Sequence, residues 1–160
     1  MNMVEIGDPA GFRAAVRASV DAAIARGTRS LLFVDPDFAG WPLDDPGLLN
    51  ALAGWLRQPG RRLTLLADRF ERIVRDHPRF THWRPAWSHA VDTRRPDEIT
   101  ATGLETLLLD DGPTVLTLWE RNPPKGRARQ DAAVAAEARD RIDAPLQRSE
   151  ADWPVRPLGL

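Results

Sequence analysis

Two carboxylates at the end of a predicted strand are the residues of this sequence best placed for chemistry. Asp35 and Asp37 follow the apolar run at 30–34, and α/β proteins bind ligands at the carboxyl ends of parallel strands. Two such carboxylates can hold Mg²⁺ between them while the first attacks a phosphate ester. One hypothesis is therefore a metal-dependent phosphate-ester hydrolase that uses Asp35 and Asp37. We favour an Asp-Pro-Asp turn without catalysis, because short motifs match by chance.

An arginine-rich stretch holds the second group of candidate residues. Residues 61–95 contain nine arginines against four acidic residues, a net charge of +5 between two negative flanks. Aromatic residues alternate with these arginines, and the two types together can pair with phosphates and stack on bases. This indicates polyanion or nucleic-acid binding, with Arg72, Arg75, Arg79 and Arg84 as candidate residues. A solvated helix face is the alternative, because the whole chain has a net charge of −1 and lacks the usual basic footprint.

Composition excludes several other classes of site. The chain of 160 residues has no cysteine, so disulfides and thiolate metal sites are excluded. Its three histidines, His77, His82 and His89, do not have the spacing of one helix face, and we predict neither a metal site nor a cofactor. No apolar run reaches the ~18 residues of a membrane span, and the first residues lack a signal-peptide pattern. We expect a cytoplasmic protein that does not bind membranes.

The predicted elements that carry these residues alternate between strand and helix. Two helices start at Asp8-Pro9 and at Asp45-Pro46, each with Asp as N-cap and Pro at the first helical position. Strands are predicted at 30–34, 62–67 and 89–92. This order predicts an α/β fold with a mostly parallel central sheet and flanking helices.

The remaining sequence has a different pattern. Residues 106–109 and 114–119 form a predicted β-hairpin, 122–126 a loop and 128–142 an Ala-rich helix. We expect one domain over residues 1–160, with 150–160 as an extended C-terminal tail.

Several of these segments together resemble one half of a phospholipase D-like fold. The strand and loop at 31–38, the leucine-striped helix after them and the strand at 62–66 resemble the opening of such a half. The hairpin at 107–112 resembles its catalytic strand, and the helix at 128–142 its closing helix. The likeness covers residues 10–150 and extends to small uncharacterised bacterial domains of that lineage.

The resemblance implies a site that has lost its reactive residues. The family carries His-x-Lys-x4-Asp, with His as nucleophile and Lys neutralising phosphoryl charge. In this sequence Leu104 and Thr106 stand at the His and Lys positions. The resemblance therefore implies a catalytically inactive binding or protein-interaction module. It also implies a homodimer, because two halves make one site in the family.

The same resemblance places an old catalytic crevice between the strand ends. We expect this crevice to be lined by Asp35, Asp37, Asp68 and Arg69, together with the segment 104–106. A protein partner is one candidate for its ligand.

Overall fold

The two long N-terminal helices begin where the sequence predicts. The computed structural model describes residues 3–98 and 103–155. Helix α1 spans Pro9–Ala25 and α2 spans Pro46–Leu56. The Asp8 carboxylate accepts a hydrogen bond from the Gly11 N–H at 2.6 Å, and Asp45 accepts one from the Gly47 N–H at 3.1 Å. These bonds satisfy backbone donors that a helix start leaves free.

All described strands belong to one mixed sheet with the order β1-β7-β6-β5-β2-β3-β4-β8. The strands are β1 (Met3–Ile6), β2 (Ser30–Val34), β3 (Arg62–Leu66), β4 (Val91–Arg95), β5 (Thr106–Asp110), β6 (Thr114–Arg121), β7 (Pro124–Gln130) and β8 (Glu150–Ala151). The other helices are α3 (Glu71–Asp76), α4 (Pro78–Trp83), the 3₁₀ helix η1 (Arg84–Trp87) and α6 (Ala132–Gln147).

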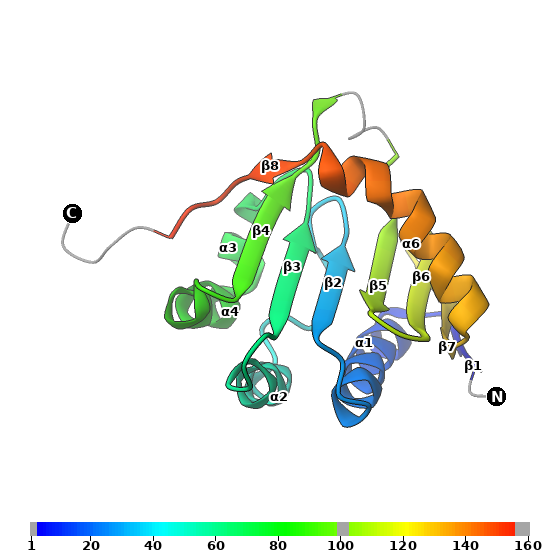
Figure 1. Ribbon diagram of the computed structural model, residues 1–160. Helices are drawn as coiled ribbons and strands as arrows, with labels where there is room; N and C mark the ends of the chain where they lie inside the picture. The colour runs from blue at the N-terminus through cyan, green and yellow to red at the C-terminus, as the bar shows by residue number, and fades with distance from the viewer. Residues whose placement is uncertain (1–2, 99–102, 156–160) are drawn as a thin grey trace.

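The expectation of a mostly parallel sheet is wrong. Within the described residues, only β2–β3 and β3–β4 are parallel, and the other five pairings are antiparallel. The alternating order correctly indicated the parallel β2–β3–β4 unit. The β5–β6 hairpin, however, is part of the same sheet and adds antiparallel strands to it. Strand β5 pairs antiparallel with β2, and β6, β7 and β1 extend the sheet from there (Figure 1).

Strand β7 shows why part of the second half was misread. Its sequence includes Pro124, Lys125 and Gly126, residue types that strands disfavour, and the segment was predicted as a loop. Gly126 is needed there because a Cβ at this position would lie 1.9 Å from the carbonyl oxygen of Thr117 in β6. The helix predicted from residue 128 therefore begins only at Ala132, after β7 ends.

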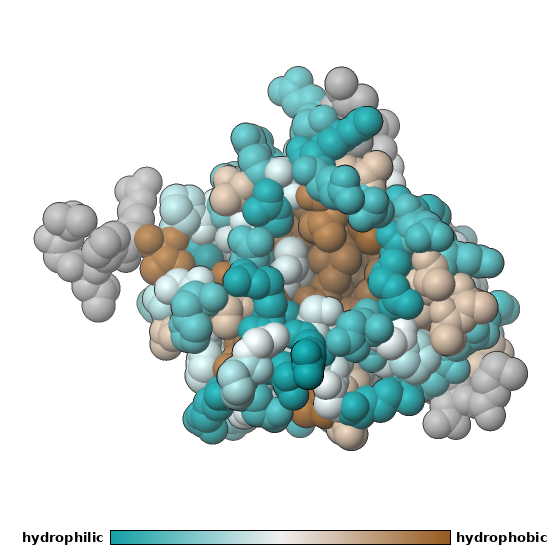
Figure 2. Space-filling view, viewed as in Figure 1, coloured by the Kyte–Doolittle hydropathy of each residue, from teal (hydrophilic) through white to brown (hydrophobic). Residues whose placement is uncertain are grey.

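Two hydrophobic clusters lie on opposite faces of the sheet. The larger cluster contains Phe33 and Leu65 and packs under α1 to α4, whereas the smaller contains Val34, Leu107 and Ile142 and packs under α6 (Figure 1). Figure 2 shows an apolar hollow beside α6 on this second face. No helix in the described ranges is long and apolar enough to span a bilayer.

The C-terminal segment 149–155 crosses the edge of the sheet at β4. Strand β8 pairs with Arg94 and Arg95, and the Asp152 N–H donates to the Thr93 carbonyl at 3.0 Å. Trp153 then stacks on Phe70 with ring centroids 5.4 Å apart. The rest of the predicted tail lies outside the described residues.

Candidate functional site

Asp35 directly follows β2 and organises the loop after it. Its Oδ2 accepts hydrogen bonds from the N–H groups of Asp37 at 3.1 Å and Phe38 at 2.7 Å. Phe38 has a φ of 61°, in the left-handed region that bulky residues rarely adopt. Its carbonyl accepts a bond from His77 Nε2 at 2.9 Å. The Asp-Pro-Asp sequence thus forms a tight turn. The Asp35 carboxylate holds its backbone N–H groups, and His77 holds the Phe38 carbonyl.

Arg121, at the end of β6, binds both carboxylates of this turn. Its Nη2 lies 2.9 Å from Asp35 Oδ2 and 2.8 Å from Asp37 Oδ1, and its Nε lies 3.4 Å from Asp35 Oδ1. Thr106, at the start of β5, donates its hydroxyl to Asp35 Oδ1 at 2.5 Å. Asp35 is 1% exposed, so a buried carboxylate is balanced by a fork of guanidinium donors.

These contacts determine the charge of each group. Burial alone would raise the pKa of Asp37, but the Ala39 N–H and the charge of Arg121 outweigh it and lower that pKa. Burial opposes the charge of Arg121, yet Asp35 and Asp37 raise the pKa of its guanidinium. Burial, with the negative charges of Asp35 and Asp37, raises the pKa of Asp68. The Arg121 cluster therefore favours the ionised form of the Asp37 carboxylate.

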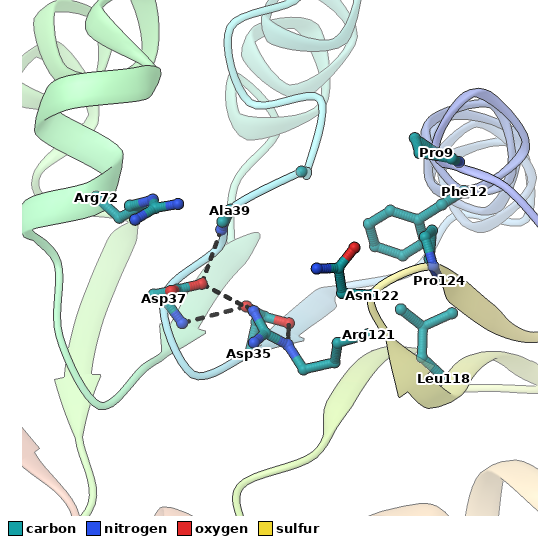
Figure 3. Close-up of a pocket in the computed structure, with 11 residues that line it drawn as sticks. Pro9, Phe12, Asp35, Asp37, Ala39, Arg72, Leu118, Arg121, Asn122 and Pro124 are labelled. Atoms are coloured by element: carbon teal, nitrogen blue, oxygen red, sulfur yellow. Dashed lines mark hydrogen bonds and ion pairs between the residues drawn. The ribbon is translucent and has the colours of Figure 1, made fainter.

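A cavity of about 350 Å³ opens beside this cluster, and we refer to it as the crevice. Figure 3 shows Arg72, from α3, on one side of the carboxylates and Phe12, from α1, on the other. Leu118 and the Asn122 amide also line the crevice, beside Arg121. Its walls thus combine balanced charges, one amide and apolar surface.

Asp68 and Arg69, also expected in the crevice, follow the end of β3. Their backbone N–H groups donate to the Pro36 carbonyl at 3.0 and 3.3 Å. The Asp68 carboxylate lines a neighbouring cavity, and among the described residues its Oδ1 is buried without a hydrogen-bond partner. Arg69 is exposed. The structure thus places Asp68 beside the crevice and Arg69 on the surface.

The two positions that the resemblance assigns to His and Lys, Leu104 and Thr106, are both buried. Leu104 is 7% exposed and packs in the smaller hydrophobic cluster. Thr106 is buried and bonded to Asp35. Between them, Glu105 forms an ion pair of 2.9 Å with Arg141.

The arginines proposed for polyanion binding are spread over two surfaces. Arg72 and Arg75 each lie 3.2 Å from Asp76, and Arg79 lies 3.7 Å from Asp44. Each of these three exposed side chains is therefore paired with a carboxylate.

Arg84, the fourth candidate, lies under the C-terminal segment. It is 5% exposed, its guanidinium carbon lies 3.6 Å from the centroid of the Trp153 ring, and it donates to the Trp153 carbonyl. Burial lowers the pKa of Arg84 to about 10.

Sequence reasoning missed Arg121. It lies 86 positions from Asp35, and only the antiparallel β2–β5–β6 arrangement brings the two together. The alternation of apolar residues predicted β6 but gave no sign of which strand β6 would lie near. Within residues 3–98 and 103–155, no cluster of three His, Asp or Glu side chains is arranged to hold a metal ion.

Comparisons with known proteins connect the chain to others through its fold alone. No family model matches the sequence, and no curated protein matches it. Among the solved structures that it resembles is TrmBL2, an archaeal chromatin protein with a novel mode of DNA binding, at 12% identity and a TM-score of 0.64. The match covers 95% of this chain but 55% of TrmBL2, so the chain spans about half of that protein.

A second solved structure matches over nearly its whole length. NucT from Helicobacter pylori, a phospholipase D-like protein, is 10% identical with a TM-score of 0.56. The match covers 94% of this chain and 98% of that one. The shared fold therefore agrees with the resemblance seen in the sequence.

Proposed function

We propose that this chain belongs to the phospholipase D-like lineage and acts as a non-catalytic binding or interaction module, with the crevice as its ligand site. The fold shared with NucT supports the lineage. The ion pairs of Arg121 with Asp35 and Asp37 support the non-catalytic role. They occupy the two carboxylates that a hydrolase would need as nucleophile and metal ligand.

The state of Asp35 opposes a role as nucleophile. Its Oδ2 accepts from two backbone N–H groups and from Arg121, and its Oδ1 accepts from Thr106 and Arg121. An attacking oxygen needs a free lone pair aimed at the substrate. A guanidinium with a raised pKa cannot serve as general acid or base either.

The hydrolase alternative would require this cluster to open. A Mg²⁺ ion bridging Asp35 and Asp37 would occupy the space where Arg121 Nη2 lies 2.9 and 2.8 Å from the two carboxylates. Arg121 would have to leave for such an ion to bind. The arrangement therefore favours binding over metal-assisted hydrolysis.

The crevice is suited to a small neutral or zwitterionic ligand. Two carboxylates and two guanidinium groups line it, so its charges balance, and Phe12 and Leu118 offer apolar contact. A volume of about 350 Å³ lies within the usual range of small-molecule sites.

A fragment screen followed by amide NMR tests this ligand site. Fragments that bind are expected to shift the amide signals of Ala39, Gly40 and the Asn122 side chain. Phe12→Trp, which narrows the crevice, should abolish those shifts, whereas Val74→Ala on the exposed part of α3 should not. Fragments that shift only signals elsewhere would contradict a ligand site in the crevice.

A homodimer is the second part of this proposal. Leu32 lies on the sheet face covered by α6 and is only half-buried, and Figure 2 shows the apolar hollow on that face. Pairing of two copies there would bury this surface. Analytical ultracentrifugation should show a dimer that Leu32→Asp converts to monomer, while Val74→Asp leaves it intact. A wild-type monomer at high concentration would contradict the dimer.

Weak nucleic-acid binding is a second candidate function. The specific observation in its favour is the shared fold with TrmBL2, whose structure shows a novel mode of DNA binding. Arg72, Arg75, Arg79 and Arg84 were the residues proposed for this role. Their pairing with carboxylates or burial reduces the charge that they offer a polyanion.

A further inference from the structure

Five arginines from two connections of the chain gather at one end of the sheet. Arg26 and Arg29 lie between α1 and β2, Arg57 and Arg61 lie between α2 and β3, and Arg62 begins β3. The two connections are adjacent, because the Arg62 N–H donates to the Arg29 carbonyl at 3.0 Å. We call these five residues the basic rim.

The basic rim and the crevice lie at opposite ends of the strands. In Figure 1 the starts of β2 and β3 lie at the lower end of the sheet, and β2 points toward the upper end, where Asp35 follows it. A change in the rim therefore leaves the Arg121 cluster untouched. The two surfaces can be tested independently.

The charge of the basic rim is not neutralised by ion pairs. None of its five arginines forms an ion pair with a carboxylate in the described part of the chain, and all except the half-buried Arg61 are exposed. The guanidinium of Arg61 instead donates to Gln58 Oε1 at 3.0 Å and to the Pro59 carbonyl at 3.4 Å. This differs from Arg17 and Arg141, which pair with carboxylates.

Three carboxylates, Asp110, Asp111 and Asp131, share this end of the sheet. Asp110 is buried and accepts from the backbone N–H groups of Gly112 and Thr114, while Asp111 accepts from Thr28 and the Arg29 N–H. They hold the β5–β6 turn against the start of β2. Asp131 pairs with Arg129 at 3.9 Å. The five arginines of the rim against Asp110 and Asp111 then leave a local positive surface on a chain whose net charge is −1.

Structural roles explain part of the basic rim only. Arg26 and Arg57 are the C-caps of α1 and α2, where a positive charge favours the helix dipole. Arg29 and Arg62 have no such role. Arg29 directly precedes β2, and Arg62, whose N–H donates to the Arg29 carbonyl, begins the neighbouring strand β3.

The composition of the rim points to the phosphate backbone of a duplex. Guanidinium groups pair bidentately with phosphates. The exposed large apolar residues of the described chain are Met3, Val4, Val74 and Trp119, and none is in the rim. The rim thus offers neither an apolar anchor for a membrane nor an aromatic ring for unpaired bases.

We infer that the basic rim binds the phosphate backbone of double-stranded nucleic acid without reading its sequence. The inference rests on the second candidate function and gives it a surface. That surface was not visible in the sequence, because Arg29 and Arg62 are 33 positions apart and belong to segments of opposite net charge.

Anisotropy of a fluorescent random-sequence DNA duplex, titrated with the full chain at several salt concentrations, tests the inference. Binding should have a Kd of roughly 10⁻⁶ to 10⁻⁴ M and weaken steeply with salt. Arg29→Gln/Arg62→Gln should weaken binding about tenfold at low salt and reduce the slope of log K against log salt by about 1.8, since each lost phosphate contact removes ~0.9.

Two further double variants with the same change in charge complete the experiment. Arg17→Gln/Arg141→Gln, on ion-paired arginines away from the rim, should leave affinity and slope unchanged. If this variant loses as much as the rim variant, only net charge matters and the inference is wrong. If Arg75→Gln/Arg79→Gln loses binding and the rim variant does not, nucleic-acid binding stands but its surface is elsewhere. If the wild-type protein binds phosphatidylserine vesicles but no duplex, both the inference and the nucleic-acid-binding function are wrong.

Discussion

The guanidinium of Arg121 lies 2.9 Å from the carboxylate of Asp35, although 86 positions separate the two residues. Asp35 is almost fully buried while Arg121 is half-exposed. The carboxylate thus gives up its hydration for contacts with Arg121, Thr106 and two backbone N–H groups. A pair of this kind is costly to break from the arginine side, because the buried charge would remain.

We expect Arg121→Gln to lower the free energy of unfolding by about 2–4 kcal/mol, because Asp35 would keep a buried charge without its counter-ion. Urea denaturation at neutral pH measures the change. Arg127→Gln is the matched control, since Arg127 forms an exposed ion pair of 2.8 Å with Glu5, and its loss should cost less than about 1 kcal/mol. Equal losses in the two variants would contradict the structural importance of the cluster.

The hydroxyl of Thr106 gives a second test of the same cluster. Thr106→Val keeps the shape of the side chain but removes the donor to Asp35, and should lower the free energy of unfolding by about 1.5–3 kcal/mol. Thr106→Ser keeps the hydroxyl and should retain more stability than the Val variant, despite the methyl group that it lacks. A Val variant more stable than the Ser variant would show that packing, and not the hydrogen bond, matters at this position.

The lowered pKa of Asp37 predicts a dependence of stability on pH. A carboxyl whose pKa is lower in the folded state stabilises it above the unfolded pKa of about 3.9. That stabilisation is lost as pH falls through the folded pKa. The stability difference between the wild type and Asp37→Asn should therefore be largest at neutral pH and should shrink below about pH 4.

Asp68 provides the opposite case for the same titration. Burial raises its pKa, so its ionised form is disfavoured in the folded state above that pKa. Asp68→Asn should therefore raise the melting temperature at neutral pH, and the gain should vanish in acid. Parallel pH profiles for the two variants would contradict the electrostatic description of these carboxylates.

The contacts of Trp153 predict that this side chain holds the C-terminal segment against the edge of the sheet at β4. Trp153→Ala removes stacking on Phe70 and Arg84 and should cost about 1–3 kcal/mol of unfolding free energy. Hydrogen exchange of the Asp152 N–H, bonded to Thr93, should accelerate in this variant. Trp119→Ala is the control, since this side chain is 57% exposed and its ring lies 5.3 Å from the Arg127 guanidinium. It should change stability by less than about 1 kcal/mol. Unchanged exchange at Asp152 would contradict the fastening role.

Local sequence signals predicted the elements near the N-terminus. Asp8-Pro9 and Asp45-Pro46 set the helix starts through hydrogen bonds within a single turn, and such contacts depend on neighbouring residues only. The run at 30–34 is apolar because β2 is a central strand that contributes side chains to the hydrophobic clusters on both faces of the sheet. These features require no knowledge of the rest of the chain.

Features that depend on the order of the strands in the sheet could not be predicted from the sequence. The hairpin at 106–119 was predicted, but its partner strand was not, because the three leucines at 107–109 would suit several places in a sheet. Arg121 and the basic rim both follow from that choice of neighbours. The sheet was therefore predicted as mostly parallel, and the strongest ion pair of the site was missed.

Hydrolysis of bis(p-nitrophenyl) phosphate and p-nitrophenyl phosphate, without metal and with Mg²⁺ or Mn²⁺, tests the central claim most directly. Because Arg121 occupies the space between Asp35 and Asp37, the wild type should release no more p-nitrophenol than Asp35→Asn under any of these conditions. Metal-dependent release by the wild type that Asp35→Asn abolishes would contradict the claim and establish the hydrolase instead.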